Sequence, residues 1–155
     1  MIIGIIIYSQ TGNTREVARR LQEKLAEKGH RAEIDEISIN GKVPAQPGGF
    51  ELSGLPDPGQ YDAVVFGSPV QAFNLNPVMR AYLDQVPMME GKEAACFITK
   101  QLPIKWTGGT RALGLIKNAC EAKGAVVKGA EIIFWTERKR RESIARAVEN
   151  LAALF

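Results

Sequence analysis

Continuous apolar runs alternate with amphipathic stretches along this chain. Residues 1–8 are almost unbroken isoleucine, a pattern typical of a strand that is covered on both faces, as in a parallel sheet. Residues 61–67, 93–99 and 126–135 carry similar apolar runs, while residues 31–37 alternate between polar and apolar positions. The pattern therefore predicts five strands, and the alternating one is expected near an edge of the sheet.

The segments between these strands have helical periodicity or helix boundary signals. Residues 13–27 place large apolar residues four apart with charged residues between them, which predicts an amphipathic helix. Asn76-Pro77 predicts the start of a second helix that ends near Pro87, because asparagine caps free N–H groups and proline suits the first turn. Two further helices are predicted, over residues 110–123 and 137–154.

Strands that alternate with helices predict right-handed βαβ crossovers and a parallel sheet covered by helices on both faces. The chain has 155 residues, which matches one domain, whereas a (β/α)₈ barrel needs about 250 residues. We therefore expect a single α/β domain over residues 1–155, built as an open doubly wound sheet of five parallel strands.

Residues 38–60 form the irregular part of the sequence, with four prolines and five glycines in 23 residues. One interpretation is a crossover that packs across one face of the sheet, with Phe50 and Leu52 as its apolar contacts. The alternative is a functional segment, such as a lid or a contact with a partner, since long irregular loops often have such roles. We favour the crossover because proline and glycine occur throughout the segment.

Composition and charge narrow the function classes. The net charge of +3, from 20 basic and 17 acidic residues, is too small to predict a nucleic-acid binder. No apolar stretch is long enough to span a bilayer, and the first residues lack the pattern of a signal peptide. Cys96 and Cys120 are expected to be buried thiols, and His30 is the single histidine, so a catalytic triad or a metal cluster is not expected. A cytoplasmic protein is the expectation.

The turn after the first strand is the strongest candidate site. It combines hydroxyls, amides and a glycine where a helix begins: Ser9, Gln10, Thr11, Gly12, Asn13 and Thr14. Such a turn can bind a phosphate group with backbone N–H groups, short hydroxyls and the positive end of the helix dipole. The alternative is an ordinary capped turn. The glycine fingerprint of dinucleotide sites does not follow the first strand. Gly109 and Gly114 have the spacing of a nucleotide P-loop, but Leu115-Ile116 occupies the positions where lysine and a serine or threonine are required.

The motif Ser9-x-x-Gly12-x-Thr14-x-x-x-Ala18-x-x-Leu21, directly after an isoleucine-rich strand, resembles the phosphate loop of the flavodoxin family. The resemblance extends over the whole chain and implies strand order 2-1-3-4-5 with FMN as cofactor. The resemblance implies that the phosphate of FMN binds the turn at residues 9–14 and that the FMN ring lies between the loops after the third and fourth strands. The residues implied there are Ser68, Pro69, Val70, Gln71, Ala72, Phe73, Thr99, Lys100, Gln101, Trp106 and Gly108, with Phe73 and Trp106 as candidates for ring stacking.

The loop after the fourth strand departs from the acidic flavodoxins. Residues 99–109 contain Lys100 and Lys105 and no carboxylate. Because a nearby ammonium favours an anionic reduced flavin, we expect a less negative reduction potential than in an acidic flavodoxin.

Three functions remain open from the sequence. The first is an FMN-binding electron carrier, a monomer or weak dimer that exchanges electrons with a redox partner protein or small acceptor. The second is an FMN-dependent NAD(P)H or quinone oxidoreductase of the same fold. The third is a flavin-free signalling or interaction domain. It is less favoured because the acidic cluster that receiver domains carry after the first strand is missing here. No nucleic-acid or membrane partner is expected.

Overall fold

The computed structural model describes residues 1–41, 50–71, 74–100, 108–135 and 140–155. Its centre is a sheet of five parallel strands in the order β2-β1-β5-β7-β8, which confirms the predicted order. The strands are β1 (Ile2–Ile7), β2 (Arg31–Glu36), β5 (Ala63–Gln71), β7 (Glu93–Lys100) and β8 (Val126–Phe134). Parallel pairing is consistent with the long apolar runs, since both faces of these strands are covered.

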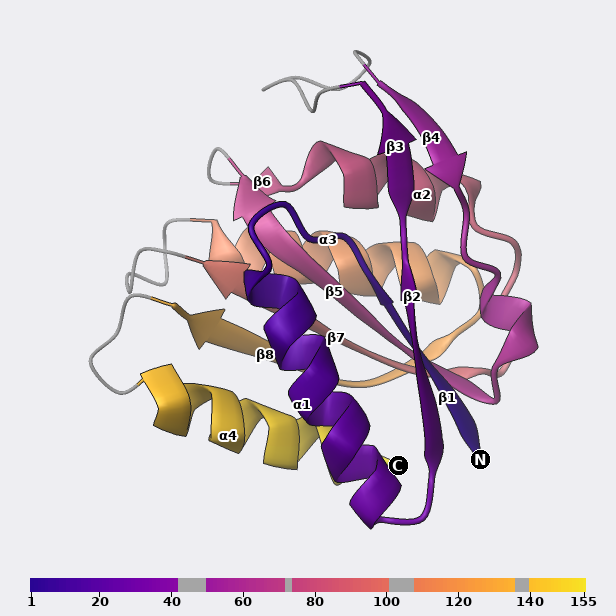
Figure 1. Ribbon diagram of the computed structural model, residues 1–155. Helices are drawn as coiled ribbons and strands as arrows, with labels where there is room; N and C mark the ends of the chain where they lie inside the picture. Colours follow the sequence, from indigo (N-terminus) through magenta and orange to yellow (C-terminus); the bar gives the residue numbers. More distant parts are fainter. Residues whose placement is uncertain (42–49, 72–73, 101–107, 136–139) are drawn as a thin grey trace.

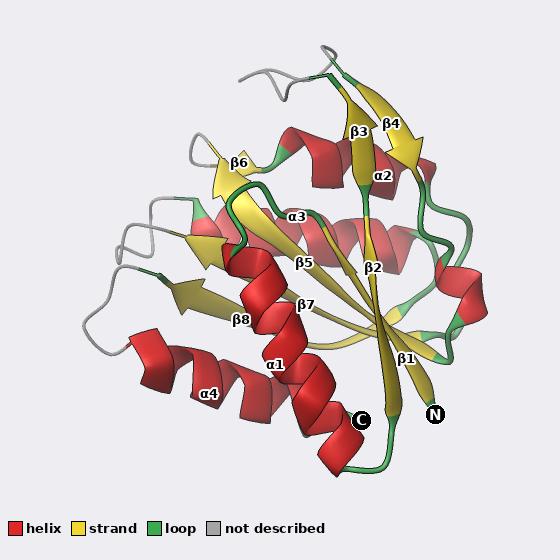
Figure 2. Cartoon of the chain, in the orientation of Figure 1, coloured by secondary structure: helices red, strands yellow, loops and turns green. Residues whose placement is uncertain are grey.

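Helices cover both faces of this sheet (Figure 1). Helices α1 (Asn13–Glu27) and α4 (Arg140–Ala152) pack side by side on one face. Helices α2 (Pro77–Gln85) and α3 (Gly109–Ala122) lie on the other face. The four α-helices begin at the edge of the sheet where the parallel strands have their carboxyl ends (Figure 2).

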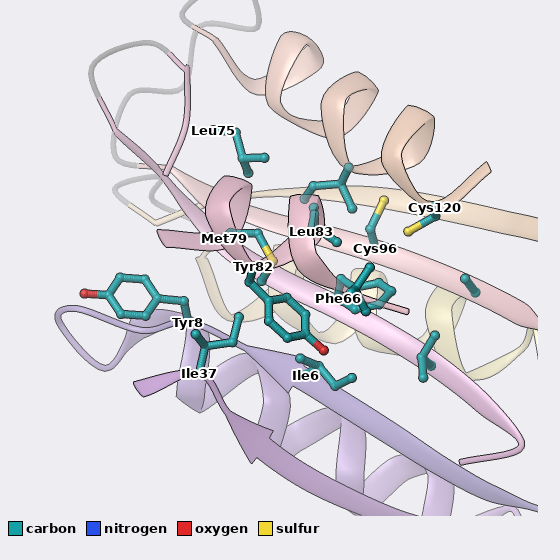
Figure 3. Packing of buried hydrophobic residues seen from close by; sticks show 14 of the residues in the cluster. Ile6, Tyr8, Ile37, Phe66, Leu75, Met79, Tyr82, Leu83, Cys96 and Cys120 are labelled. Carbon is teal, nitrogen blue, oxygen red and sulfur yellow. The ribbon is translucent and has the colours of Figure 1, made fainter. Parts of the chain in front are cut away.

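Two apolar clusters fill the space between the sheet and the helices. The cluster beneath α2 and α3 includes Ile6, Phe66, Tyr82 and both cysteine side chains (Figure 3). The cluster beneath α1 and α4 is built from the alternate positions of the same strands, such as Ile5 and Phe97. The alternation of strand side chains between the two clusters explains why β1, β5 and β7 are apolar at nearly every position.

The third parallel strand is longer than the sequence suggested. We expected a loop from Ser68 onward, but β5 continues to Gln71 and pairs there with β6 (Asn74–Leu75) in an antiparallel hairpin. The prediction of a loop at residues 68–71 was therefore wrong. Backbone pairing with β6 supports this extension, which the side chains alone do not indicate.

Residues 38–60 contain more regular structure than predicted. Strands β3 (Ser38–Asn40) and β4 (Glu51–Gly54) form an antiparallel pair, and a short 3₁₀ helix, η1, covers Pro58–Gln60. Phe50 and Leu52 pack against the cluster beneath α2 and α3, as the crossover interpretation predicted. The hydroxyl of Tyr82 donates a hydrogen bond to the carbonyl of Pro56, at 2.6 Å, and ties this segment to α2.

Candidate functional site

A cavity of about 140 Å³ lies at the carboxyl ends of β1, β5 and β7. The residues that line it are Gln10, Thr11, Asn13, Pro69, Val70, Thr99 and Lys100, all of which the sequence predicted as site residues. The chain leaves β1 for β2 on one side and later returns to β5 on the other, so the strand order reverses here. Ligands of open α/β sheets bind at such a reversal.

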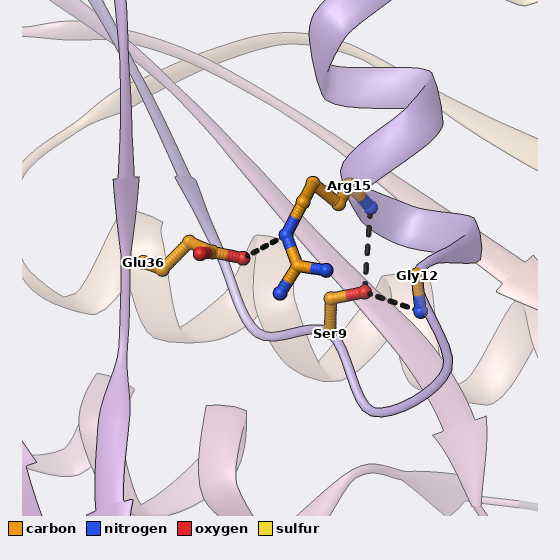
Figure 4. Close-up of polar contacts among 4 residues, drawn as sticks. All are labelled: Ser9, Gly12, Arg15 and Glu36. Carbon is orange, nitrogen blue, oxygen red and sulfur yellow. Dashed lines mark hydrogen bonds and ion pairs between the residues drawn. The ribbon is translucent and has the colours of Figure 1, made fainter.

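The turn between β1 and α1 is held by its own side chains (Figure 4). The hydroxyl oxygen of Ser9 accepts hydrogen bonds from the backbone N–H groups of Gly12, at 3.2 Å, and Arg15, at 3.4 Å. The guanidinium of Arg15 in turn pairs with Glu36 at the end of β2, with 2.8 Å between Nε and Oε1. Ser9 therefore shapes the turn that borders the cavity.

Helix α1 begins at this turn with a glycine as its N-cap residue. Gly12 has a φ of 92°, in the left-handed region that suits glycine, and has no side chain to cap the helix, so Ser9 provides the side-chain acceptor for the N–H of Arg15. The first N–H groups of a helix have no partner inside the helix. Within the described residues, those of Asn13 and Thr14 donate to no other acceptor, so they are available to an anion.

A buried hydrogen bond connects the first turn to the end of β7. The hydroxyl oxygens of Thr14 and Thr99 are 3.0 Å apart, and both side chains are buried. The Thr14 side chain is thus a fixed contact between α1 and the sheet, while Thr99 also lines the cavity.

Asn76 connects the turn between β1 and α1 to the end of β5, a role that the sequence did not predict. Its side chain is fully buried. The amide nitrogen donates to Gln10, at 3.3 Å, and to Gln71, at 2.8 Å, while the amide oxygen accepts from the N–H of Val78 and caps α2. The sequence identified only the cap; the additional signal was that a buried asparagine amide needs partners for its two N–H hydrogens.

Lys100 is a buried basic residue that lines the cavity. It is the last residue of β7, its side chain is 5% exposed, and it lines the cavity next to Thr99. Its ammonium lies 5.4 Å from the centre of the Phe134 ring. Burial lowers the pKa of Lys100 from its ordinary value, because the charged form is less well solvated there than in water.

Several predicted site residues do not line this cavity. The hydroxyl of Ser68 is buried and donates to the carbonyl of Pro69, and Gln71 accepts from Asn76. Gly108 is the left-handed N-cap of α3, with a φ of 100° and no side-chain cap. Four predicted residues lie outside the described residues: Ala72, Phe73, Gln101 and Trp106.

The described residues offer no alternative centre for metal chemistry. No group of three or more histidine, cysteine or acidic side chains among them is arranged to hold a metal ion. None of the helices formed by these residues combines the length and apolar character that crossing a membrane requires. His30 lies in the turn between α1 and β2, at the end of the sheet opposite the cavity.

Comparison with solved structures confirms the flavodoxin-like fold that the sequence resemblance implied. The flavodoxin of Streptococcus pneumonia TIGR4 superposes over 100% of both chains with a TM-score of 0.70 and 17% sequence identity. A flavoprotein from Lactobacillus acidophilus NCFM, solved in complex with FMN, superposes with a TM-score of 0.61 and 19% identity, over 84% of this chain and 91% of that one. No family model matches the sequence.

One curated protein is similar in sequence. An NAD(P)H dehydrogenase (quinone) from Archaeoglobus fulgidus is 27% identical over 121 residues, which cover 65% of this chain and 62% of that protein. The match thus spans less than two thirds of the length of this relative.

Proposed function

We propose that this chain is an FMN-binding flavoprotein that transfers electrons between redox partners. The main support is the position of the cavity, which lies where the strand order reverses and beside the start of α1, whose Asn13 and Thr14 N–H groups have no acceptor among the described residues. A second support is that a flavoprotein of the same fold is known in complex with FMN.

The residues around the first turn fit a phosphate group. The N–H groups of Asn13 and Thr14 and the side chains that line the cavity would donate to its oxygens. A Cβ atom added to Gly12 would have no atom within 4 Å, so the turn leaves open space where a ligand can approach. The positive end of the α1 dipole adds to the attraction.

The remaining cavity residues fit a flat ring with polar edges. Pro69 and Val70 supply an apolar wall, and Gln10 and Thr99 supply polar groups. The volume of about 140 Å³ holds only part of such a ligand, since sites that enclose a drug-sized molecule measure about 300–1,000 Å³. Stacking of the ring on Phe73 or Trp106 stays a prediction, because both lie outside the described residues.

When bound, FMN would supply the one- and two-electron chemistry. The chain's residues would bind it, orient it and exclude water, and no side chain is proposed as a nucleophile or general base. Electron transfer requires only that part of the ring remain accessible to the partner.

A second candidate function is an FMN-dependent NAD(P)H or quinone oxidoreductase. The sequence similarity to the NAD(P)H dehydrogenase (quinone) favours it. The two functions differ in one measurement: a stand-alone oxidoreductase oxidises NADH or NADPH with a quinone in the purified holoprotein, whereas a carrier requires a separate reductase.

FMN titration of the purified chain, followed by flavin fluorescence, tests the common part of both proposals. We expect saturable binding with one FMN per chain. The double variant Thr11→Ala with Asn13→Ala removes two cavity side chains and should weaken binding by about 100-fold, or about 3 kcal/mol, if each donates to a charged group. Thr14 is retained because its hydroxyl also contacts Thr99.

The control variant is Ser53→Ala with Asn118→Ala, which removes two exposed polar side chains away from the cavity. It should bind FMN like the wild type. Wild-type protein that binds no FMN, or a double variant with undiminished affinity, would contradict the proposed site.

A further inference from the structure

A second cavity, of about 200 Å³, lies between the segment that follows β4 and the end of α2. We call it the η1–α2 groove, and it is lined by Leu55, Pro56, Asp57, Tyr82, Gln85, Val86 and Pro87. Helix α2 has 9 residues, which makes it about 13 Å long. Asn76 at its start contacts Gln10 of the FMN cavity, whereas its other end borders the η1–α2 groove (Figure 1). The two cavities therefore lie at opposite ends of α2.

The two sides of the η1–α2 groove are fixed to each other. The hydroxyl of Tyr82, on α2, donates a hydrogen bond to the carbonyl of Pro56 on the other side, at 2.6 Å. Asp57 next to it caps η1 by accepting from the N–H of Gly59, at 2.8 Å. Pro56, Tyr82 and Val86 are buried. Since these walls are already ordered, a partner that binds them loses little affinity to ordering.

Large apolar side chains are exposed beside this groove. Leu55, which lines it, is 53% exposed, and Met88, directly after Pro87, is 61% exposed. Exposed apolar side chains that gather in one place mark interaction surfaces, whereas single ones are ordinary. A cavity of about 150 Å³ accommodates benzene, while drug-sized ligands need about 300 Å³ or more. The groove therefore has room for one aromatic side chain.

The polar side of the η1–α2 groove is acidic. Asp57 is exposed and is the one charged residue among the seven that line the groove. Within the described residues, the N–H of Gly59 is the one donor to its carboxylate. The pKa of Tyr82 is raised first by burial and then by the carboxylates of Asp35 and Asp57, which indicates a negative potential along the groove. A lysine or arginine of a partner would be complementary to it.

We propose that the η1–α2 groove is a docking site for a protein partner that inserts one aromatic side chain next to a lysine or arginine. The ring would pack against Leu55, Val86 and Pro87, and the cation would pair with Asp57. A partner bound here leaves the FMN cavity uncovered, because the groove lies at the other end of α2. The docking site does not depend on FMN binding.

The probe is the acetylated and amidated peptide Gly-Lys-Phe-Lys-Gly, added to the purified chain and followed by amide chemical shifts in NMR spectra. We expect saturable shifts around the groove, with a dissociation constant of about 1 mM or tighter. A peptide with alanine in place of phenylalanine should bind about tenfold more weakly. A peptide with glutamate in place of both lysines should bind about fivefold more weakly or less.

Two variants of the chain test the groove residues. Leu55→Ser removes the exposed apolar side chain, and Asp57→Asn removes the charge while asparagine can still cap η1. Each should weaken binding of the probe by about fivefold. Val126→Ser is the matched control, because Val126 is also 53% exposed but lies on β8 and does not line the groove. This control should bind the probe like the wild type.

No binding of the probe, shifts that map to the FMN cavity, or undiminished binding in both groove variants would overturn the docking proposal. So would shifts at the groove that appear on raising the protein concentration alone and that Leu55→Ser abolishes, because a second copy of the chain would then occupy the groove. Each of these results leaves the proposed FMN binding intact, since FMN titration measures it separately.

Discussion

Gly67 lies where the sheet leaves no room for a side chain. A Cβ atom added there would be 2.2 Å from Cζ of Phe97, a buried residue of β7. We expect Gly67→Ala to lower the free energy of unfolding by about 1–3 kcal/mol, because the ring or the strand must shift. Urea unfolding measures the effect.

Gly114 is the matched control for this substitution. It lies within α3, and an added Cβ would meet no atom within 4 Å. Gly114→Ala should therefore increase stability by up to about 1 kcal/mol through helix propensity. Equal effects of the two alanine substitutions would contradict the packing argument.

The two buried thiols predict a loss of stability at alkaline pH. Burial raises the pKa of both Cys96 and Cys120 to about 12, from an ordinary value of 9.0. Above pH 9 the unfolded chain releases thiol protons that the folded chain keeps, so the unfolding free energy falls as pH rises from about 9 towards 12. The slope is at most about 1.4 kcal/mol per pH unit for each thiol.

Urea unfolding between about pH 8 and pH 10 measures this slope. Burial also raises the pKa values of Tyr8, Tyr61 and Tyr82, so these tyrosines act in the same direction as the thiols in the upper part of this range. The lowered pKa of Lys100 makes the unfolding free energy rise with pH in this range, which opposes the effect of the thiols. The thiol contribution is therefore measured as the difference in slope between the wild type and a variant without the thiols. The variant with Cys96→Ala and Cys120→Ala should have a flatter profile than the wild type. Parallel profiles would mean that the thiols do not titrate differently in the two states.

At the scale of the elements, Asn76 joins the start of α2 to the turn between β1 and α1 and to the end of β5. Asn76→Ala removes the helix cap and leaves Gln10 and Gln71 without their shared donor. We expect a loss of about 1–3 kcal/mol in unfolding free energy and weaker FMN binding, since Gln10 lines the cavity. Thermal unfolding and FMN titration give the two values.

Asp57→Ala is the control that distinguishes the loss of a helix cap from a change at the cavity. Asp57 caps the 3₁₀ helix η1 by accepting from the N–H of Gly59, at 2.8 Å, and it does not line the FMN cavity. We expect it to reduce stability without changing FMN affinity. If Asn76→Ala binds FMN as tightly as the Asp57 variant does, the asparagine is only a cap.

Elements with a strong local pattern could be predicted from the sequence. Helix α1 has the predicted bounds, and Asn76-Pro77 marks the start of α2 because cap and proline act within one turn. The β3–β4 pair and the end of β5 could not be predicted, since backbone hydrogen bonds between separate segments form them. Residue type alone does not indicate which separate segments will form such backbone hydrogen bonds.

The same distinction applies to the site. The turn at residues 9–14 could be selected as a candidate because its residues are contiguous and follow a strand. The roles of Asn76 and Lys100 depend on partners that are distant in sequence, such as Gln10 and Phe134. The sequence could indicate the charge of Lys100, but its burial follows from the packing of α3 and β8 around β7.

For the whole molecule, the distribution of arginine predicts how charged acceptors approach. Each of the four α-helices carries an arginine in the first turn of its described range: Arg15, Arg80, Arg111 and Arg140. Helix starts usually favour acidic residues, and these starts gather at the edge of the sheet that contains the cavity. This edge should therefore attract anions.

We expect the reduced holoprotein to react with ferricyanide at a rate that falls as salt increases, and with hexaammineruthenium at a rate that rises. Stopped-flow absorbance measures both. Arg80→Glu with Arg111→Glu should reduce the ferricyanide rate at low salt by about tenfold. Arg31→Glu, at the opposite edge, should have little effect. An equal change in the logarithm of the rate for each reversed charge in the two variants would show that only net charge matters.

The glycine starts of α1 and α3 have a consequence for the lifetime of the protein. Both helices begin at a left-handed glycine without the side-chain cap that α2 has, and a cap contributes about 0.5–2 kcal/mol. A ligand that binds the start of α1 would restore part of this stability by mass action. Newly synthesised chains would then be degraded faster in riboflavin-starved cells, and vitamin supply would set the steady-state abundance of the protein.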